Sequence, residues 1–283
     1  MKIHWHLNRE KRYPFGERGP DPEWFEPIGF PPPWPDRPWI FGVMVASANG
    51  VVAWKRTGAG DDPVAAVLNG GGARPERIAD RRHMRHLRCY GDVSVGAQTL
   101  RDQPSLVQTP QEPGEPPVPK LYDFRRRHGL PHQPRVIVYS LYGRLDPGLA
   151  VFNAPDVEAI LVGTSTAEAT LAARGLADRS VDFITEDVRE PDGLRRAHER
   201  VFAERGVRYL ACEGGETMLR ALRRANLLDE VFLTSTDAVI DESAHEHVLK
   251  TMDFEREGAT LIAEGRIAPE SGYVFRRWRL NDR

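Results

Sequence analysis

Cysteine is scarce in this sequence. The 283 residues include only Cys89 and Cys212, which are too few for a disulfide framework or a cysteine-based zinc site. No stretch of about 18 consecutive apolar residues occurs, so we expect no transmembrane helix. The formal net charge of -2 provides no overall field that would attract nucleic acid or an anionic membrane. These absences favour a cytoplasmic protein that binds neither nucleic acid nor a membrane.

Proline and tryptophan are concentrated at the amino-terminal end. Residues 28–35 read IGFPPPWP, and prolines at this density exclude a helix and a central strand. The aromatic residues of this region argue against simple disorder. We therefore predict an extended arm over residues 1–38, laid across the body or a neighbouring subunit, and a single domain over residues 39–283.

Short apolar runs alternate with helical patterns through the rest of the chain. This alternation predicts an α/β fold with a mixed, mostly parallel sheet flanked by helices. The predicted strands are residues 39–47, 51–54, 92–96, 135–139, 158–163, 181–184, 207–213, 230–234, 260–263 and 273–280, and the predicted helices are 75–88, 166–174, 192–205 and one from 215. Segments 57–74 and 103–134 are predicted to be loops. The last two strands are expected to pair antiparallel at a sheet edge, with arginines on its exposed side.

The turn after the strand at 207–213 has the residues needed to hold an anion. Gly214 and Gly215 separate this strand from a helix, and such a turn aims backbone N–H groups at a ligand. Glycine lets the backbone approach that ligand closely. Glu213 stands at the strand end, where ligands of α/β sheets collect. Taken alone, the segment is more often a plain turn with a surface glutamate.

Two more strand ends carry small hydroxyl or acidic residues. Gly96 ends one strand and is followed by Thr99 and Asp102, while Thr164 follows the end of another. Each is typical of an ordinary capped helix start when taken alone, whereas three such turns in one chain indicate a shared nucleotide cleft. The chain has neither a complete GxGxxG fingerprint nor a GxxxxGK[ST] loop, which excludes the standard dinucleotide motif and a P-loop kinase.

Together these motifs resemble the reductase domain of riboflavin-biosynthesis enzymes, which belongs to the dihydrofolate-reductase-like family. The family pattern is an apolar strand ending Ser-x-Asp-Gly, a helix with Leu-Arg, a Val-Gly-Ala-x-Thr turn before Asp-x-Pro-x-Leu, and a late strand ending Glu-Gly-Gly. This sequence carries, in the same order, the segments 47–50 (SANG), 87–88 (LR), 95–106 (VGAQTLRDQPSL) and 213–215 (EGG). The resemblance covers roughly residues 38–282.

The resemblance implies an NADPH-dependent reductase, commonly a homodimer. The chain has no Cys-x-x-Cys motif, so the implied form is the reductase without the paired zinc deaminase domain. The positions that match cofactor contacts of the family are Ala53, Gly96, Thr99, Asp102, Thr164, Gly214, Gly215, Glu216, Thr217 and Met218. The positions that match substrate contacts are Arg88, Leu106 and Glu213.

The implied reaction is hydride transfer from NADPH to a ring-opened sugar or an imine. The substrate would be of the 5-amino-6-(5-phosphoribosylamino)uracil or 2,5-diamino-6-ribosylamino-pyrimidinone phosphate class. Glu213 would hydrogen-bond the ring, and water or Asn49 would act as the general acid. Asn49 replaces the family's aspartate, Val51 replaces a basic residue, and Thr109 replaces an arginine that helps hold the substrate phosphate. Losing two positive groups would weaken phosphate binding.

These departures leave two other functions open. One is reduction of a pterin-like or dihydrofolate-like substrate, and the other is a protein of this fold that binds NADPH or a pterin without efficient catalysis. Arg101 or the arginines at 125–127 would have to replace the missing phosphate contacts, although the run 125–127 is more typical of a solvated face. We expect no metal site, because the histidines lack carboxylate or cysteine partners at ligand spacing.

Overall fold

The computed structural model describes residues 2–9, 13, 15, 19–21, 28–57, 62–68, 74–111, 118–176 and 181–281. Their strands form a ten-stranded sheet of order β1-β11-β12-β9-β2-β8-β4-β5-β6-β7 and a two-stranded sheet of β10 and β3. The strands are β1 (His4–Asn8), β2 (Trp39–Ala46), β3 (Val51–Ala53), β4 (Asp92–Gly96), β5 (Val136–Ser140), β6 (Ala159–Gly163), β7 (Val181–Thr185), β8 (Tyr209–Cys212), β9 (Glu230–Ser235), β10 (Leu249–Lys250), β11 (Thr260–Arg266) and β12 (Val274–Arg279).

The long sheet is parallel over most of its width. All neighbours from β9 to β7 pair in parallel, whereas β12, β11 and β1 add to the β9 side in antiparallel pairs. The mixed, mostly parallel sheet with an antiparallel edge is therefore confirmed. Strand β8 lies between β2 and β4 although it comes much later in the chain. Ligands of open α/β sheets bind at the carboxyl ends of strands where the strand order changes direction in this way.

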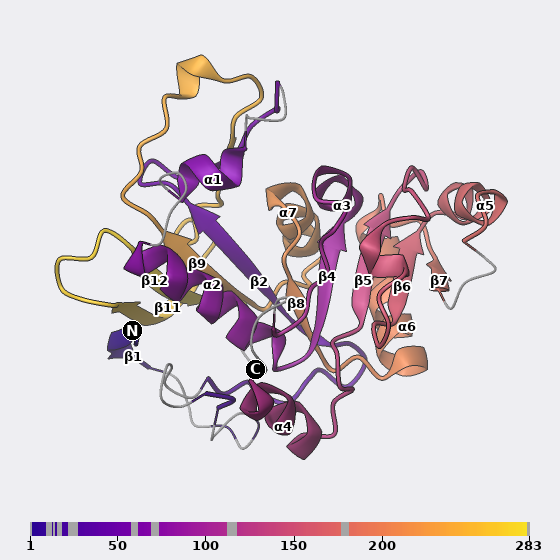
Figure 1. Ribbon diagram of the computed structural model, residues 1–283, viewed down its shortest axis with the longest axis horizontal. Helices are drawn as coiled ribbons and strands as arrows, with labels where there is room; N and C mark the ends of the chain where they lie inside the picture. Colours follow the sequence, from indigo (N-terminus) through magenta and orange to yellow (C-terminus); the bar gives the residue numbers. More distant parts are fainter. Residues whose placement is uncertain are drawn as a thin grey trace.

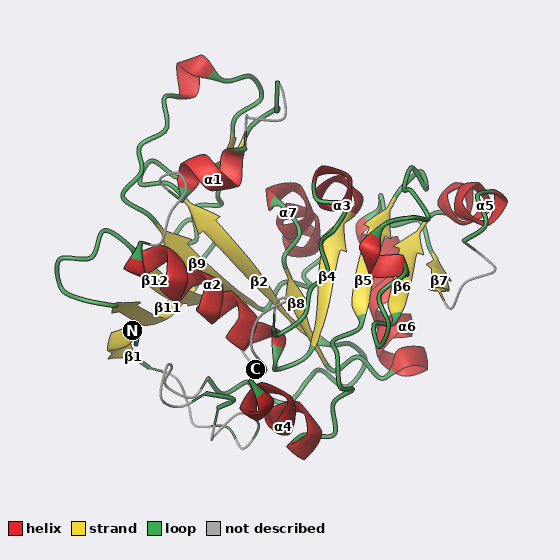
Figure 2. Ribbon diagram, viewed as in Figure 1, coloured by secondary structure: helices red, strands yellow, loops and turns green. Residues whose placement is uncertain are grey.

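Helices cover both faces of the sheet (Figures 1 and 2). They are α1 (Pro63–Val67), α2 (Pro75–Arg88), α3 (Ala97–Asp102), α4 (Pro119–Arg127), α5 (Ser165–Ala173), α6 (Pro191–Arg205), α7 (Glu216–Arg224) and the 3-10 helices η1 (Ala150–Phe152) and η2 (Glu242–Ala244). Successive side chains of β5 point to opposite faces of the sheet. Ile137 packs in the hydrophobic core that includes α6 and α7, and Val138 packs in the core on the other face. In the described part of the chain, no helix is long and apolar enough to cross a membrane.

Two segments predicted to be loops contain helices. Helix α1 lies within 57–74 and α4 lies within 103–134, so those two predictions are wrong at these places; residues 58–61, 69–73 and 112–117 of the same segments lie outside the described residues. Both helices begin with a proline at the first helical position, where its missing N–H costs nothing. Leu121 and Phe124 of α4 are buried. Their separation of three residues is typical of the apolar face of a helix, but the neighbouring prolines made the segment look like a loop.

Arg125 is fully buried rather than part of a solvated face, so that prediction is also wrong. Its Nη1 donates to the carbonyl oxygens of Arg88 at 2.9 Å and Gly91 at 2.7 Å, and its Nε donates to Pro131 at 2.8 Å. Because the last carbonyls of a helix have no partner within the helix, a cation there is stabilising. Arg125 thus attaches α4 to the carboxyl end of α2. Its neighbour Arg126 is exposed and pairs with Asp123.

The antiparallel edge is built differently from the expectation. Strand β1, from the amino-terminal arm, pairs with β11 and forms the outer edge. The arginines of β12 do not line an exposed side: Arg277 is 1% exposed and its Nη2 lies 2.7 Å from Glu230 Oε2. Arg279 also pairs with Glu230, which lies opposite it in register, and Arg276 pairs with Glu264 of β11. The buried carboxylate of Glu230 explains why Arg277 and Arg279 face inward, whereas Arg276 and its partner Glu264 are partly exposed.

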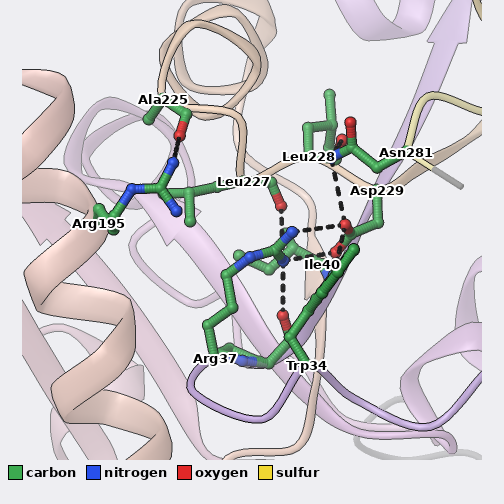
Figure 3. A network of polar contacts seen from close by, with 10 residues as sticks. Trp34, Arg37, Ile40, Arg195, Ala225, Leu227, Leu228, Asp229 and Asn281 are labelled. Atoms are coloured by element: carbon green, nitrogen blue, oxygen red, sulfur yellow. Dashed lines mark hydrogen bonds and ion pairs between the residues drawn. The ribbon is translucent and has the colours of Figure 1, made fainter. Parts of the chain in front are cut away.

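A buried ion pair attaches the arm to the body near the amino end of β2 (Figure 3). Arg37 donates to both carboxylate oxygens of Asp229 at 2.8 Å. Asp229 also accepts from the backbone N–H of Ile40 at 2.8 Å and from Trp34 Nε1 at 2.9 Å. Trp34 stacks on Trp39, the first residue of β2. The carboxylate therefore joins the arm, β2 and the segment entering β9. The donors within 2.9 Å of its oxygens belong to Trp34, Arg37 and Ile40.

Replacing Asp229 with asparagine should lower the free energy of unfolding by about 3–5 kcal/mol, because it leaves the buried Arg37 guanidinium without its counter-charge. Urea denaturation measures this loss. The matched control is Glu246→Gln, which removes the charge from the exposed pair with Lys55 and should cost about 0–1 kcal/mol. Equal costs for the two variants would contradict the role given to Asp229.

Candidate functional site

The predicted glycine turns meet at the carboxyl ends of two neighbouring strands. Strand β8 pairs with β4 so that Cys212 lies opposite Ser94, and the N–H of Glu213 donates to the Ser94 carbonyl at 2.9 Å. Helix α3 therefore begins beside the turn from which α7 begins (Figure 1). Cys212 is buried, and burial raises the pKa of its thiol to about 11. A thiol with this pKa is protonated at neutral pH and is not a nucleophile.

Gly96 and Gly215 are the amino-terminal caps of α3 and α7. Neither the backbone conformation nor the packing within the chain requires a glycine at these two positions. Their φ angles are -80° and -62°, and a Cβ at either position would meet no atom within 4 Å. Gly163 differs, because its Cβ would collide with the backbone oxygen of Ser140. No side chain caps α3 or α7. Space and uncapped N–H groups therefore lie together at this edge, as an anionic cofactor requires.

Arg88 and Glu213, both predicted to contact substrate, bind each other. Arg88 Nε donates to Glu213 Oε1 at 2.6 Å and Nη2 donates to Oε2 at 2.7 Å, a two-bond pairing of guanidinium and carboxylate. The two side chains are 4% and 10% exposed. Arg88 also donates through Nη1 to the Thr109 carbonyl at 3.0 Å and through Nη2 to the sulfur of Met84. Most of its donors are therefore occupied within the chain.

Asn49 lies after β2, in the turn that leads to β3. Its Oδ1 accepts from Ser47 Oγ at 2.8 Å and from the N–H of Ile240 at 3.1 Å. Its Nδ2 donates to the Ile240 carbonyl at 2.9 Å and to Glu242 at 3.2 Å. Both ends of the amide thus hold the β2–β3 turn against the segment after β9. Ala53 lies farther along, in β3, opposite Leu249 of β10.

The remaining predicted cofactor residues lie along the same edge of the sheet. Thr99 and Asp102 belong to α3, where Asp102 accepts from Gln98. Thr164 follows β6, caps α5 through its hydroxyl oxygen and donates to the Leu141 carbonyl at 2.7 Å. Because β6 is three strands from β8, Thr164 is displaced by roughly 14 Å from the glycine turn. The predicted residues therefore form an extended row rather than a compact cluster.

The loop after β5 supplies exposed residues that the sequence interpretation did not single out. Tyr142 is 56% exposed, and the guanidinium of Arg144 lies 5.4 Å from the centre of its ring. Arg101 of α3 donates to the Arg144 carbonyl at 3.1 Å. The only sequence signal was an aromatic residue and an arginine directly after a predicted strand. An exposed ring beside the Arg144 guanidinium suits a nucleotide base and a phosphate.

Glu216, the first residue of α7, is a buried carboxyl group. Its Oε1 lies 2.8 Å from Arg220 Nε, and Arg220 Nη2 donates to the Lys250 carbonyl. Burial outweighs the attraction of Arg220 and raises the pKa of Glu216 to about 7. The group therefore titrates near neutral pH while it joins α7 to the segment that contains β10. Its carboxyl points into this contact, while Gly215 and Thr217 on either side of it are exposed.

No group of histidine, cysteine, aspartate or glutamate residues able to hold a metal ion occurs in the described part of the chain. His83 and His86, on α2, are buried, and burial lowers the pKa of both below its usual value. Both imidazoles are therefore neutral at physiological pH.

Searches against family models and curated proteins find no match for this chain, whereas several solved structures are similar to it in fold. A pyrimidine reductase-like protein of Corynebacterium diphtheriae has a TM-score of 0.60 at 18% identity, with 88% of this chain and 94% of that chain covered. RibD of Acinetobacter baumannii has a TM-score of 0.60 at 14% identity over 88% of this chain. The chain has the fold of RibD-type reductase domains.

The structural similarity covers most of this chain but only part of the longer RibD chain. The match spans 59% of the Acinetobacter RibD chain. The riboflavin biosynthesis reductase Rib7 of Saccharomyces cerevisiae matches with a TM-score of 0.52 at 14% identity, and 90% of its chain is covered. The dihydrofolate-reductase-like fold expected from the sequence motifs agrees with these similarities. Identities this low establish the fold alone.

The raised pKa of Glu216 should make stability fall as pH rises. The folded protein keeps this proton up to about pH 7, whereas the unfolded chain loses it near pH 4.5, so the free energy of unfolding decreases across that window. Glu216→Gln lacks this titrating group. The difference in free energy of unfolding, variant minus unmodified protein, should therefore rise by up to about 3 kcal/mol between pH 4.5 and pH 8. Urea titrations at each pH measure the difference, with Glu246→Gln as the exposed control. A difference that does not change with pH would contradict the prediction.

Proposed function

We propose that this protein is an NADPH-dependent oxidoreductase of the riboflavin-biosynthesis pyrimidine reductase type. The observation that carries the proposal is the space beside Gly96 and Gly215, where two uncapped helix starts meet at the point of the sheet at which the strand order changes direction. The fold similarity to reductases named for pyrimidine and riboflavin chemistry supports the same function.

In this proposal the backbone N–H groups at the start of α7, around Gly215, Glu216 and Thr217, hold the cofactor diphosphate, whereas the N–H of Met218 already donates to the Gly215 carbonyl at 2.9 Å. Helix starts favour negative charge, and the exposed Gly215 allows close approach. Thr99, Asp102 and Thr164 then contact the remainder of an extended dinucleotide along the strand ends. Bound NADPH would supply the hydride, and the protein would supply orientation and electrostatics.

Glu213 would accept a hydrogen bond from the substrate ring. Arg88 holds its carboxylate in a fixed direction and neutralises its charge in a site that is largely removed from water. Asn49 is less suited to donate the proton, because an amide is not an acid and both of its polar ends are already bound. We therefore assign proton donation to water and assign Asn49 to positioning the β2–β3 turn.

Binding without efficient catalysis is a second candidate function. The observation that favours it is the closed pair of Arg88 and Glu213, since a ring that needs the carboxylate must share it with the guanidinium. Saturable NADPH binding without NADPH oxidation across pyrimidine, pterin and flavin substrates would support this function over the reductase.

Gly215→Ala should fold normally and bind NADPH at least tenfold more weakly. The added Cβ meets nothing in the chain and requires no change of φ, but it occupies the space that the diphosphate needs. Isothermal titration calorimetry measures affinity, and thermal unfolding verifies the fold. Glu190→Ala, at the start of α6 where no side-chain cap is lost, is the matched control and should bind as the unmodified protein does. Unchanged affinity in Gly215→Ala would contradict the diphosphate site.

We propose that Arg144 binds the phosphate group that distinguishes NADPH from NADH. Loss of one charge-assisted hydrogen bond is worth about 1.5–3 kcal/mol, so Arg144→Ala should weaken NADPH binding by about 10- to 100-fold and leave NADH binding nearly unchanged. Arg126→Ala removes an exposed arginine on α4 and should alter neither. Equal loss of both affinities, or loss of neither, would show that Arg144 does not select the cofactor.

A further inference from the structure

We propose that Asp80 determines substrate specificity and selects a ring with an exocyclic amino group beside a ring N–H, as in a 2-aminopyrimidinone, over the matching ring with a carbonyl there, as in a uracil. This inference rests on the proposed reductase function and names the substrate class of the same edge of the sheet. The observation that carries it is a second carboxyl group, outside the Arg88–Glu213 pair, at the partly exposed end of β2.

The carboxyl half of β2 is less covered than its place in the sheet predicts. Strand β2 lies between β8 and β9 in parallel pairs, yet Val43 and Val45 are only partly buried, whereas residues 39–42 are buried. Both valines face α2: Val43 packs with the core that contains Leu87, and Val45 packs with the core that contains Ala79. Strands of parallel sheets are normally buried on both faces. Water therefore reaches the α2 face of the sheet at this end of β2.

Helix α2 presents three functional side chains along one face. It lies on the sheet alongside β2 (Figure 1), and Asp80, Met84 and Arg88 follow one another at intervals of four, which places them in one row spanning about 12 Å. Arg88 binds Glu213, while Asp80 and Met84 are partly exposed. The row thus carries a carboxyl group at one end, the pair with Glu213 at the other and an apolar side chain between them.

Asp80 is held over the sheet from the side of β9. The Thr234 hydroxyl donates to its carboxylate, and Thr234 lies in β9 opposite Val45 of β2. On the other side of β2, Glu213 follows β8 level with Val43, because the residues before them pair in register. Asp80 and Glu213 therefore flank the partly exposed end of β2 from opposite sides, and a ring lying there has an acceptor at each of two edges.

Asp80 is ionised in the folded protein at neutral pH. Burial raises the pKa of its carboxyl group to about 6, although the Thr234 hydroxyl and the guanidinium groups of Arg77 and Arg81 on the same helix act to lower this pKa. Above about pH 7 the group is therefore mostly a carboxylate. A carboxylate only accepts hydrogen bonds, and its two oxygens have more acceptor positions than the one that Thr234 occupies.

A carboxylate distinguishes the two kinds of ring by what they offer at one edge. A 2-aminopyrimidinone presents its amino group and the neighbouring ring N–H, which donate to the two carboxylate oxygens in parallel, as the Arg88 guanidinium does to Glu213. A uracil presents a carbonyl oxygen in place of the amino group, so that two acceptors face each other. Loss of one hydrogen bond to a charged group lowers affinity by about 10- to 100-fold.

Isothermal titrations of the unmodified protein compare two matched pairs of rings, with saturating NADP⁺ and without cofactor. The first pair is 2,5-diamino-6-ribosylamino-pyrimidinone phosphate and 5-amino-6-(5-phosphoribosylamino)uracil. The second is 7,8-dihydropterin and 7,8-dihydrolumazine. The members of each pair differ only in the amino or carbonyl group.

We expect the amino member of at least one pair to bind at least tenfold more tightly than its carbonyl partner, and the pair that shows the preference identifies a monocyclic or a bicyclic substrate. Equal affinities within both pairs, tighter binding of the carbonyl members, or binding of none of the four compounds would overturn the inference.

Asp80→Asn should reduce the preference to threefold or less, because an amide both donates and accepts and can serve either ring. Thermal unfolding verifies the fold of the variant. Asp123→Asn, which removes an exposed carboxylate of α4 paired with Arg126, is the matched control and should keep the preference. A purely structural role for Asp80 would weaken both members of a pair equally, and an unchanged ratio in the folded variant would contradict the inference.

Thr234→Val replaces Asp80→Asn if that variant does not fold. It removes the hydroxyl that holds the carboxylate and should lower the preference at least threefold. An unchanged ratio in Thr234→Val would then overturn the inference.

The proposed function is judged by a separate measurement, the titration of NADPH alone. Saturable NADPH binding without a preference for the amino rings would reject this inference and leave the reductase function standing. Absence of NADPH binding would reject the reductase function, whatever the four rings do.

Discussion

The placement of β8 between β2 and β4 is the constraint on which the candidate site depends. It brings Glu213, which follows a late strand, next to Gly96, which follows an early one, and their adjacency is fixed by the backbone hydrogen bond from Glu213 to Ser94. Two helix starts consequently converge on one edge of the sheet. No local feature of either turn produces this arrangement, because each is an ordinary strand–helix connection until the other lies beside it.

Charge pairing then determines what the site can accept. Arg88 and Glu213 neutralise each other at the carboxyl end of β8, and Arg125 holds the end of the helix that carries Arg88 by binding carbonyl oxygens there. Arg101 and Arg144 lie toward β5, where the Arg144 guanidinium approaches the exposed ring of Tyr142. The edge is thus divided into a neutralised end at β8 and a cationic end at β5.

Sequence patterns predicted the strands and helices of the parallel sheet closely, because continuous apolar runs and 3.6-residue periodicity report burial directly. Helix α2 agrees with its predicted range, residues 75–88. Helix α4 was missed because proline in a first turn resembles proline in a loop. The positions of β1 and of the buried arginines depend on partners distant in sequence, such as Glu230 for Arg277, and no local signal contains that information. The glycine turns were identified from the sequence, whereas the pairing of Arg88 with Glu213 required the structure.

A crystal structure of the protein with NADPH bound tests the central claim most directly. The account predicts that the cofactor diphosphate lies within hydrogen-bond distance of backbone N–H groups at the start of α7, over the space beside Gly215 and Gly96, with the adenosine end extending toward Arg144. A cofactor bound away from the carboxyl ends of β8 and β4, or density for none at saturating concentration, would contradict it.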